Sequence, residues 1–91
     1  MKVLVLYQPH SEHRIAVEEL VREYKQLYPG SMIEVLDVEQ EDGTAMAKLY
    51  GMMRYPSFMV LRDDGSMVQS WEGESELPRP EDIIYYASSN L

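Results

Sequence analysis

The sequence predicts a single α/β domain over residues 1–91, with a small mixed β-sheet at its centre. Three observations lead to this prediction. Early in the chain, two apolar runs flank a segment whose apolar residues recur every three or four positions, which indicates strand, helix and strand. Later, two short apolar segments meet at an Asp-Gly turn, which is typical of a β-hairpin. A chain of 91 residues with 45% hydrophobic and 26% charged residues is that of one ordinary globular domain.

The first part of the chain predicts a strand–helix–strand unit. Residues 3–7 form a continuous apolar run, which suits a strand buried on both faces. From about Glu12 the apolar positions follow a helical period, with Ser11 as the expected N-cap and Pro29 at the end of the helix. Residues 32–38 then indicate a second strand. Two strands joined by a helix of this length should be parallel, with a right-handed crossover.

A second, shorter helix is predicted between Thr44 and Tyr50. Gly51 follows it directly and is the expected C-terminal stop, because glycine readily adopts the left-handed conformation found at helix ends. Ala45 and Leu49 are expected to face the core, with Met46 as a further candidate for the inner side.

The last part of the chain predicts a hairpin and a final helix. Residues 57–61 and 67–71 are the expected strands, joined by a turn at residues 63–65. The final helix should begin at Pro80, a residue suited to a first helical turn. The apolar residues expected to dock this helix on the sheet are Ile83, Ile84, Ala87 and Leu91.

Composition excludes several classes of function. The net charge is −8, from 16 acidic and 8 basic residues without a basic cluster, so a nucleic-acid partner is not expected. There is no cysteine, which removes disulfides, thiolate nucleophiles and thiolate metal ligands. The apolar run near the start is too short for a secretory signal or a membrane span, so a cytoplasmic protein that does not enter the membrane is expected.

Several short motifs occur in a fixed order along the chain. They are Ala45 followed by Tyr50-Gly51, then Tyr55-Pro56-Ser57, the turn at Asp64-Gly65, and Gly73 after the last strand. With the element order βαβαββα, this series resembles the thioredoxin-like superfamily, in its minimal thioredoxin or glutaredoxin-like form, over nearly the whole chain. The resemblance implies a sheet in the order 2-1-3-4 flanked by helices, with Pro56 as a cis proline.

The residues that carry redox chemistry in this superfamily are missing. The segment from His10 to His13, His-Ser-Glu-His, stands where the resemblance places a Cys-x-x-Cys motif. The buried acid of the first strand is replaced by Leu4, and the lysine that pairs with it falls near Val35. Because thiol–disulfide exchange requires a thiol, the chain is predicted to be a redox-inactive member that is not a thiol–disulfide oxidoreductase. Whether another catalytic activity remains stays open.

The proline turn is the main candidate site. In this superfamily the backbone beside the cis proline pairs with an extended peptide, so the resemblance implies a protein or peptide partner there. Arg54 could meet a carboxylate of the partner, while Tyr55 and the neighbouring methionines either contact the partner or pack beneath the loop. The residues predicted to bind the partner are His10, Ser11, His13, Met53, Arg54, Tyr55 and Pro56.

A metal site is the alternative hypothesis. His10 and His13 lie three positions apart at the expected helix start and could share a face, with Glu12 as a further ligand. The chain would then be a metal-binding protein or a metal-dependent enzyme. The other interpretation is that both histidines are exposed polar residues of a helix start. Two histidines alone are fewer than the three or four ligands that a metal site needs, so no cofactor is expected.

Overall fold

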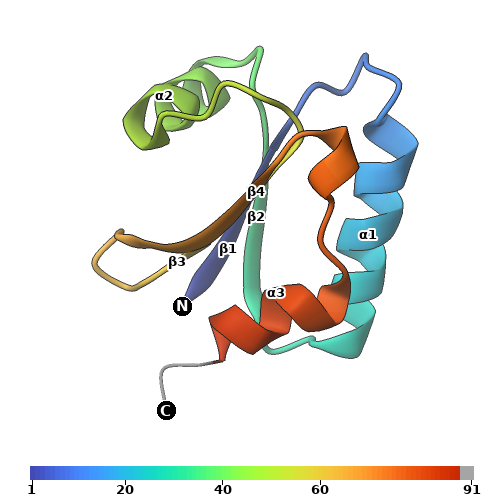
Figure 1. Cartoon of the computed structure of the whole chain (residues 1–91), viewed down its shortest axis with the longest axis vertical. Helices are drawn as coiled ribbons and strands as arrows, with labels where there is room; N and C mark the ends of the chain where they lie inside the picture. The colour runs from blue at the N-terminus through green and yellow to red at the C-terminus, as the bar shows by residue number, and fades with distance from the viewer. Residues whose placement is uncertain (89–91) are drawn as a thin grey trace.

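The structure is a computed structural model that describes residues 1–88. Figure 1 shows a central sheet with helices packed on both of its faces. The elements are β1 (Lys2–Tyr7), α1 (Arg14–Leu27), β2 (Met32–Asp37), α2 (Glu41–Tyr50), β3 (Ser57–Leu61), β4 (Met67–Glu72), a short 3₁₀ turn (Glu74–Glu76) and α3 (Pro80–Ala87).

The four strands lie in the order β2-β1-β3-β4, which confirms the predicted strand order. β1 is parallel to β2, as the crossover helix requires, and antiparallel to β3. β3 and β4 form the predicted hairpin, with an irregularity in register between Val60 and Leu61. Ser57, the first residue of β3, lies between Leu6 on one side and Glu72 on the other, so the ends of β1 and β4 and the start of β3 share one end of the sheet.

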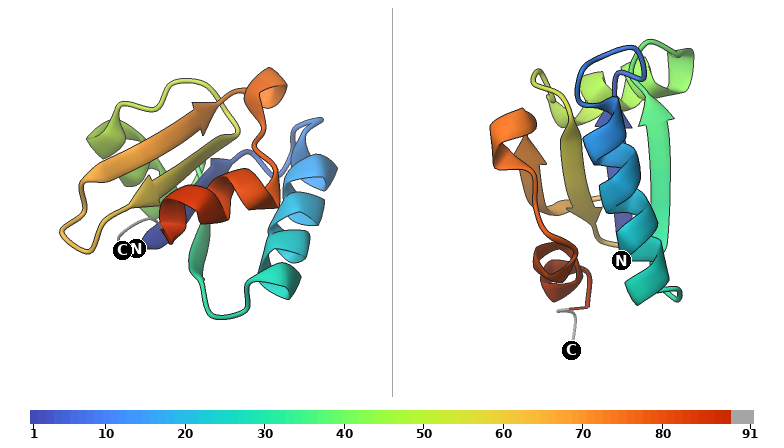
Figure 2. Two further views of the ribbon diagram at one scale, coloured as in Figure 1. Left: turned by 60° about the horizontal axis from the view of Figure 1, so that its bottom comes forward. Right: turned by 90° about the vertical axis from the view of Figure 1, so that its right-hand side faces the viewer.

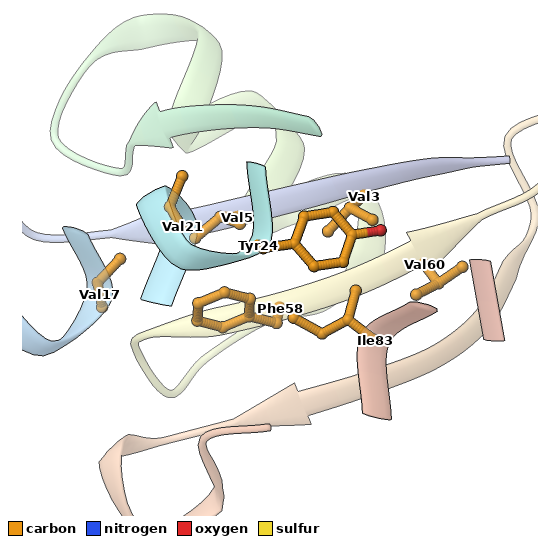
Figure 3. Packing of buried hydrophobic residues seen from close by; sticks show 8 residues of the cluster. All are labelled: Val3, Val5, Val17, Val21, Tyr24, Phe58, Val60 and Ile83. Carbon is orange, nitrogen blue, oxygen red and sulfur yellow. The ribbon is translucent and has the colours of Figure 1, made fainter. Parts of the chain in front are cut away.

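Two hydrophobic clusters lie on opposite faces of the sheet. Helices α1 and α3 cover one face, and α2 covers part of the other (Figures 1 and 2). Along β3, Phe58 and Val60 point toward α1 and α3, whereas Met59 and Leu61 point toward α2. Figure 3 shows the buried residues of the first cluster, which are Val3, Val5, Val17, Val21, Tyr24, Phe58, Val60 and Ile83. Those of the second cluster are Leu4, Leu6, Ala47, Met52, Met59 and Leu61.

Helix α1 begins later than the sequence predicts. Its first residue is Arg14 and its N-cap is His13, whose side chain makes no capping hydrogen bond. The prediction that Ser11 is the N-cap is wrong, because the Ser11 hydroxyl instead donates to the carbonyl oxygen of Gln8 at 2.6 Å. This bond holds Ser11 in a turn that precedes the helix.

Helix α2 begins earlier than predicted, and a different side of it faces the sheet. It starts at Glu41 rather than Thr44. Leu49 is 68% exposed and Ala45 is also exposed, whereas Ala47 is buried. The prediction that Ala45 and Leu49 face the core is therefore wrong.

Gly43 explains this orientation of α2. A β-carbon at Gly43 would overlap the backbone carbonyl of Asp37, at the end of β2. The first turn of α2 can therefore lie this close to the β2 backbone only with glycine at the contact. Ala47 is one helical turn further on, so the same side of the helix carries it into the core.

The last helix docks as expected over the part that the structure describes. Ile83 is fully buried in the first cluster, and Ile84 and Ala87 pack against it. Leu91 lies outside the described residues. Among the helices of residues 1–88, none has the length and apolar character needed to cross a bilayer.

Candidate functional site

Two loops and the end of β4 meet at one end of the sheet. The entry loop, defined as residues 8–13, leaves β1, and the proline loop, defined as residues 51–56, leads into β3. Because β1 and β3 are antiparallel neighbours, with Leu6 opposite Ser57, the two loops leave the sheet side by side. The structure therefore places the two segments of the predicted site at the same end of the sheet (Figure 1).

The first half of the proline loop is anchored to α2. Gly51 ends the helix in the left-handed conformation, with φ 68°. Met52 is buried, and its N–H donates to the carbonyl of Ala47 at 2.9 Å. The hydroxyl of Tyr55 reaches back to donate to the Met52 carbonyl at 3.0 Å. The Tyr55 side chain therefore folds under its own loop, as one of the two interpretations of the sequence expected.

The second half of the proline loop is anchored to the sheet. The Ser57 hydroxyl donates to the carbonyl of Arg54 at 2.6 Å, and the N–H of Gly73 donates to the carbonyl of Pro56 at 2.8 Å. The peptide bond between Tyr55 and Pro56 is cis. The loop is thus held from both ends by hydrogen bonds within the domain.

The backbone of Tyr55, like the Met53 carbonyl and the Arg54 N–H just before it, takes no part in these hydrogen bonds. Within residues 1–88, neither its N–H nor its carbonyl oxygen has a protein hydrogen-bond partner. Most backbone polar groups in folded proteins are paired with protein or with water. One donor and one acceptor on the same residue therefore have no partner within residues 1–88.

Met53 and Arg54 extend from the loop beside this backbone. Met53 is 85% exposed, and its N–H lies 3.4 Å from a carboxylate oxygen of Glu72. The guanidinium of Arg54 lies over Gly73, where a β-carbon would come within 2.9 Å of Nη2. Gly73 also has φ 93°, so both its conformation and this close approach favour glycine. None of the ion pairs within residues 1–88 involves Arg54.

The two histidines of the entry loop have different environments. His13 is only 6% exposed, and its Nε2 accepts a hydrogen bond from the N–H of Gln8 at 3.4 Å. His10 is exposed. The expectation that they share a face is wrong, because His13 lies one turn before the buried Val17 and points inward with it. The alternative of two exposed histidines holds for His10 and is wrong for His13.

This arrangement does not assemble a metal-binding set in the described part of the chain. Within residues 1–88, no three side chains of histidine, aspartate or glutamate come together in a way that could hold a metal ion. The hydrogen bond from the Gln8 N–H occupies the Nε2 lone pair of His13, so this nitrogen is not free to bind a metal.

A groove beside the proline loop was not predicted from the sequence. It has a volume of about 310 Å³, and we call it the α2 groove. It runs between the end of β2, α2 and the loop, and its lining residues are Val38, Thr44, Ala47, Lys48, Gly51, Met52, Met53 and Tyr55. A prediction that Ala47 lies on the inner side of α2 would have indicated this groove. The predicted orientation of the helix instead placed Leu49 on its inner side.

Comparison with known proteins identifies the fold. No protein-family model matches this sequence, and no curated protein matches it. Among solved structures, a chain from work on thiol resolution in a yeast mitochondrial 1-Cys peroxiredoxin by glutathione and thioredoxin systems is similar, with a TM-score of 0.70 and 19% identity over 94% of this chain and 74% of that one. The first two thioredoxin domains of Saccharomyces cerevisiae Eps1p give a TM-score of 0.66 and 14% identity over 94% of this chain and 34% of theirs.

These similarities show a thioredoxin-like fold, as the sequence motifs implied. At identities of 19% and 14% they establish the fold alone. The chain carries this fold without any cysteine, so it lacks the Cys-x-x-Cys motif and its side chains provide no thiol for disulfide exchange.

Proposed function

We propose that this domain is a redox-inactive binding module that holds an extended segment of a partner protein along the backbone of Tyr55. The observation that carries the proposal is the free N–H and carbonyl of Tyr55, which lie between two carbonyls, those of Arg54 and Pro56, that are already hydrogen-bonded. An extended peptide presents an N–H and a carbonyl in the complementary arrangement. Such pairing is a short form of β-augmentation, in which main-chain bonds hold the partner and nearby side chains select it.

The rigidity of the loop supports this role. Its anchors to Ala47 at one end and to Gly73 at the other keep the Tyr55 backbone in place before the partner arrives. Binding then requires little ordering of the loop, which lowers the entropic cost of association. Two backbone hydrogen bonds contribute only about 1 kcal/mol each, so side-chain contacts must supply most of the affinity.

The predicted site residues divide into contacting and supporting roles. Met53 and Arg54 are exposed beside Tyr55 and would contact the partner, and His10 is the exposed residue of the entry loop. Pro56 and His13 are buried and would support the surface. We expect the partner to be a protein segment in the cytoplasm.

Site-specific photo-crosslinking tests the proposal. A photoreactive phenylalanine analogue is placed at Met53, which is 85% exposed, and as a matched control at Tyr85, which is 68% exposed on α3. We expect position 53 to capture one defined segment of a partner, identified by mass spectrometry, and position 85 to miss it. A synthetic peptide of that segment should then shift the Tyr55 amide signal in NMR and protect it from hydrogen exchange.

Two results would contradict the proposal. Equal capture at both positions would indicate unspecific contact. A captured peptide that binds without changing the Tyr55 amide would show that the partner uses another surface.

A further inference from the structure

The surroundings of Tyr55 point to the chemistry of the partner segment, and this inference rests on the proposed function. We infer that the segment carries one apolar side chain flanked on both sides by carboxylates. The apolar side chain would fill the α2 groove. The carboxylates would lie near Lys48 on one side and Arg54 on the other.

The α2 groove accounts for the apolar side chain. Most of its walls are apolar, with Val38, Ala47, Met52 and Met53 among them, and Tyr55 forms the side next to the free backbone. Its volume of about 310 Å³ lies at the lower end of the range for small-ligand sites. A space of this size suits a single large apolar side chain, and the exposed methionine thioether can adjust to its shape.

Two cations lie on different sides of the Tyr55 backbone. Lys48 lines the groove from α2, and the Arg54 guanidinium lies over Gly73, after β4. Neither takes part in an ion pair within residues 1–88, which is also true of Arg22, Lys25 and Arg62, so it is the position of Lys48 and Arg54 beside Tyr55 that matters. In a chain with 16 acidic and 8 basic residues, two cations left unpaired beside a free backbone segment are complementary to an acidic partner.

One acidic group opposes this complementarity. The carboxylate of Glu72 accepts a hydrogen bond from the N–H of Met53, with 3.4 Å between nitrogen and oxygen, so it lies at the loop residue next to Arg54. It should weaken the binding of an acidic segment by like-charge repulsion. Removal of the Glu72 carboxylate should therefore strengthen the binding of an acidic segment, whereas removal of a cation should weaken it.

Four capped synthetic peptides provide the first test. Their central residues are Glu-Leu-Glu, Gln-Leu-Gln, Lys-Leu-Lys and Glu-Gly-Glu, each flanked by glycine. Binding to isotope-labelled protein is followed by NMR at millimolar peptide, with the Tyr55 amide as the reporter. We expect Glu-Leu-Glu to bind about 3- to 10-fold more tightly than Gln-Leu-Gln, because each rim charge contributes modestly. Loss of the leucine should weaken binding by about 10-fold or more.

Charge variants of the protein provide the second test, with the Glu-Leu-Glu peptide as the probe. Lys48→Glu and Arg54→Glu should each weaken its binding by about 3- to 10-fold. Arg22→Glu makes the same change in net charge at an exposed position on α1 and should change the affinity less than about 2-fold. Glu72→Gln should strengthen binding. Unchanged NMR signals for the core residues of each variant confirm that it remains folded.

The outcomes separate this inference from the proposed function. If all four peptides shift the Tyr55 amide with equal affinity, the backbone site stands and the inferred partner chemistry is wrong. If Lys-Leu-Lys binds most tightly, the charge argument is reversed and the inference fails. If no peptide at millimolar concentration affects Tyr55, the inferred partner chemistry is wrong, and the crosslinking experiment at Met53 decides the proposed function separately.

Discussion

The two faces of the sheet differ in how completely they are packed. The face under α1 and α3 holds a cluster built from both helices and the sheet, with Tyr24, Phe58 and Ile83 fully buried (Figure 3). The other face has only α2, a helix of 10 residues, and its cluster contains six buried residues. Two hollows of about 310 Å³ each lie on this second face, the α2 groove and another lined in part by Leu4, Met46 and Leu61. On the first face a hollow of about 430 Å³ lies at the edge of the cluster, lined by partly buried residues such as Tyr28 and Ile84, and leaves the fully buried residues closely packed.

This difference separates the part of the domain that mainly supports folding from the part beside the proposed binding surface. Close packing under α1 and α3 contributes most of the apolar burial, on which folding stability mainly depends. The open packing under α2 leaves concave apolar surface next to the proline loop, where a partner could contribute the missing contacts. The comparison therefore predicts that similar substitutions on the two faces change the free energy of unfolding by different amounts.

The largest effect is expected from two neighbouring residues of β3 that point to opposite faces. Phe58 and Met59 are both 0% exposed, one in each cluster. We expect Phe58→Ala to lower the free energy of unfolding by about 3–5 kcal/mol. Met59→Ala should lower the free energy of unfolding by about 2–3 kcal/mol, which is near the lower end of the range for a buried methionine. The loss is small because side chains beside the two hollows can move into the space that the methionine leaves.

Urea unfolding of both variants measures this difference. Ile83→Val, expected to cost about 0.5–1.5 kcal/mol, probes the densely packed face if Phe58→Ala does not fold. A larger loss for Met59→Ala than for Phe58→Ala would show that the α2 face is the better packed of the two.

A smaller effect is expected where α2 contacts the sheet. Replacing an ordinary helical glycine with alanine stabilises a protein by about 0.5–1 kcal/mol. At Gly43 the new methyl group would overlap the carbonyl of Asp37, so we expect Gly43→Ala to destabilise by about 1–3 kcal/mol instead. Gly30→Ala is the matched control, because its β-carbon meets nothing within 4 Å, and it should stay within about 0.5 kcal/mol. Stabilisation by Gly43→Ala in urea unfolding would contradict the described contact between α2 and β2.

The smallest effect is a pH dependence from the densely packed face. Burial raises the pKa of Tyr24 above its usual value; the hydrogen bond with Ser31 acts to lower it, and Tyr28 acts to raise it. The folded state therefore favours the neutral phenol. Its contribution to stability is fully present below the unfolded pKa of about 10 and is lost as pH rises through the higher folded pKa.

Replacement of Tyr24 by phenylalanine tests this pH dependence. Tyr24→Phe should make the fall in stability above pH 10 less steep, by at most about 1.4 kcal/mol per pH unit. Burial and the hydrogen bond with Glu18 also raise the pKa of Tyr7, so Tyr7→Phe should change the slope in the same direction. Urea unfolding at several alkaline pH values measures the slopes, and an unchanged slope for Tyr24→Phe would exclude this origin.

The fold could be predicted because its signals are local. The apolar run of β1 and the turn between β3 and β4 are visible without any knowledge of tertiary contacts. The strand order followed from the resemblance. The orientation of α2 could not be predicted, because Leu49 and Ala45 fit a helical period as well as Ala47 does. The contact between Gly43 and Asp37 decides between them, and that contact exists only in the folded chain.

The candidate site was predicted in position and only partly in composition. The sequence pointed to the proline turn, and the exposed Met53 and Arg54 lie there. It did not predict the burial of His13, because a histidine at a helix start was expected to face solvent, although its position one turn before Val17 places it on the inner side of α1. It also missed Lys48, because the groove that this residue lines depends on the orientation of α2.

The position of β3 in the sheet has a consequence for how the chain folds. β1 pairs with β2, which begins at residue 32, and also with β3, which begins at residue 57. While the chain is being synthesised, the strand–helix–strand unit is complete long before the second neighbour of β1 emerges. Until then one edge of β1 exposes unpaired backbone groups and apolar side chains, the features that promote association between chains. Docking of β3 through the proline loop covers this edge of β1, and β4 then covers the remaining edge of β3.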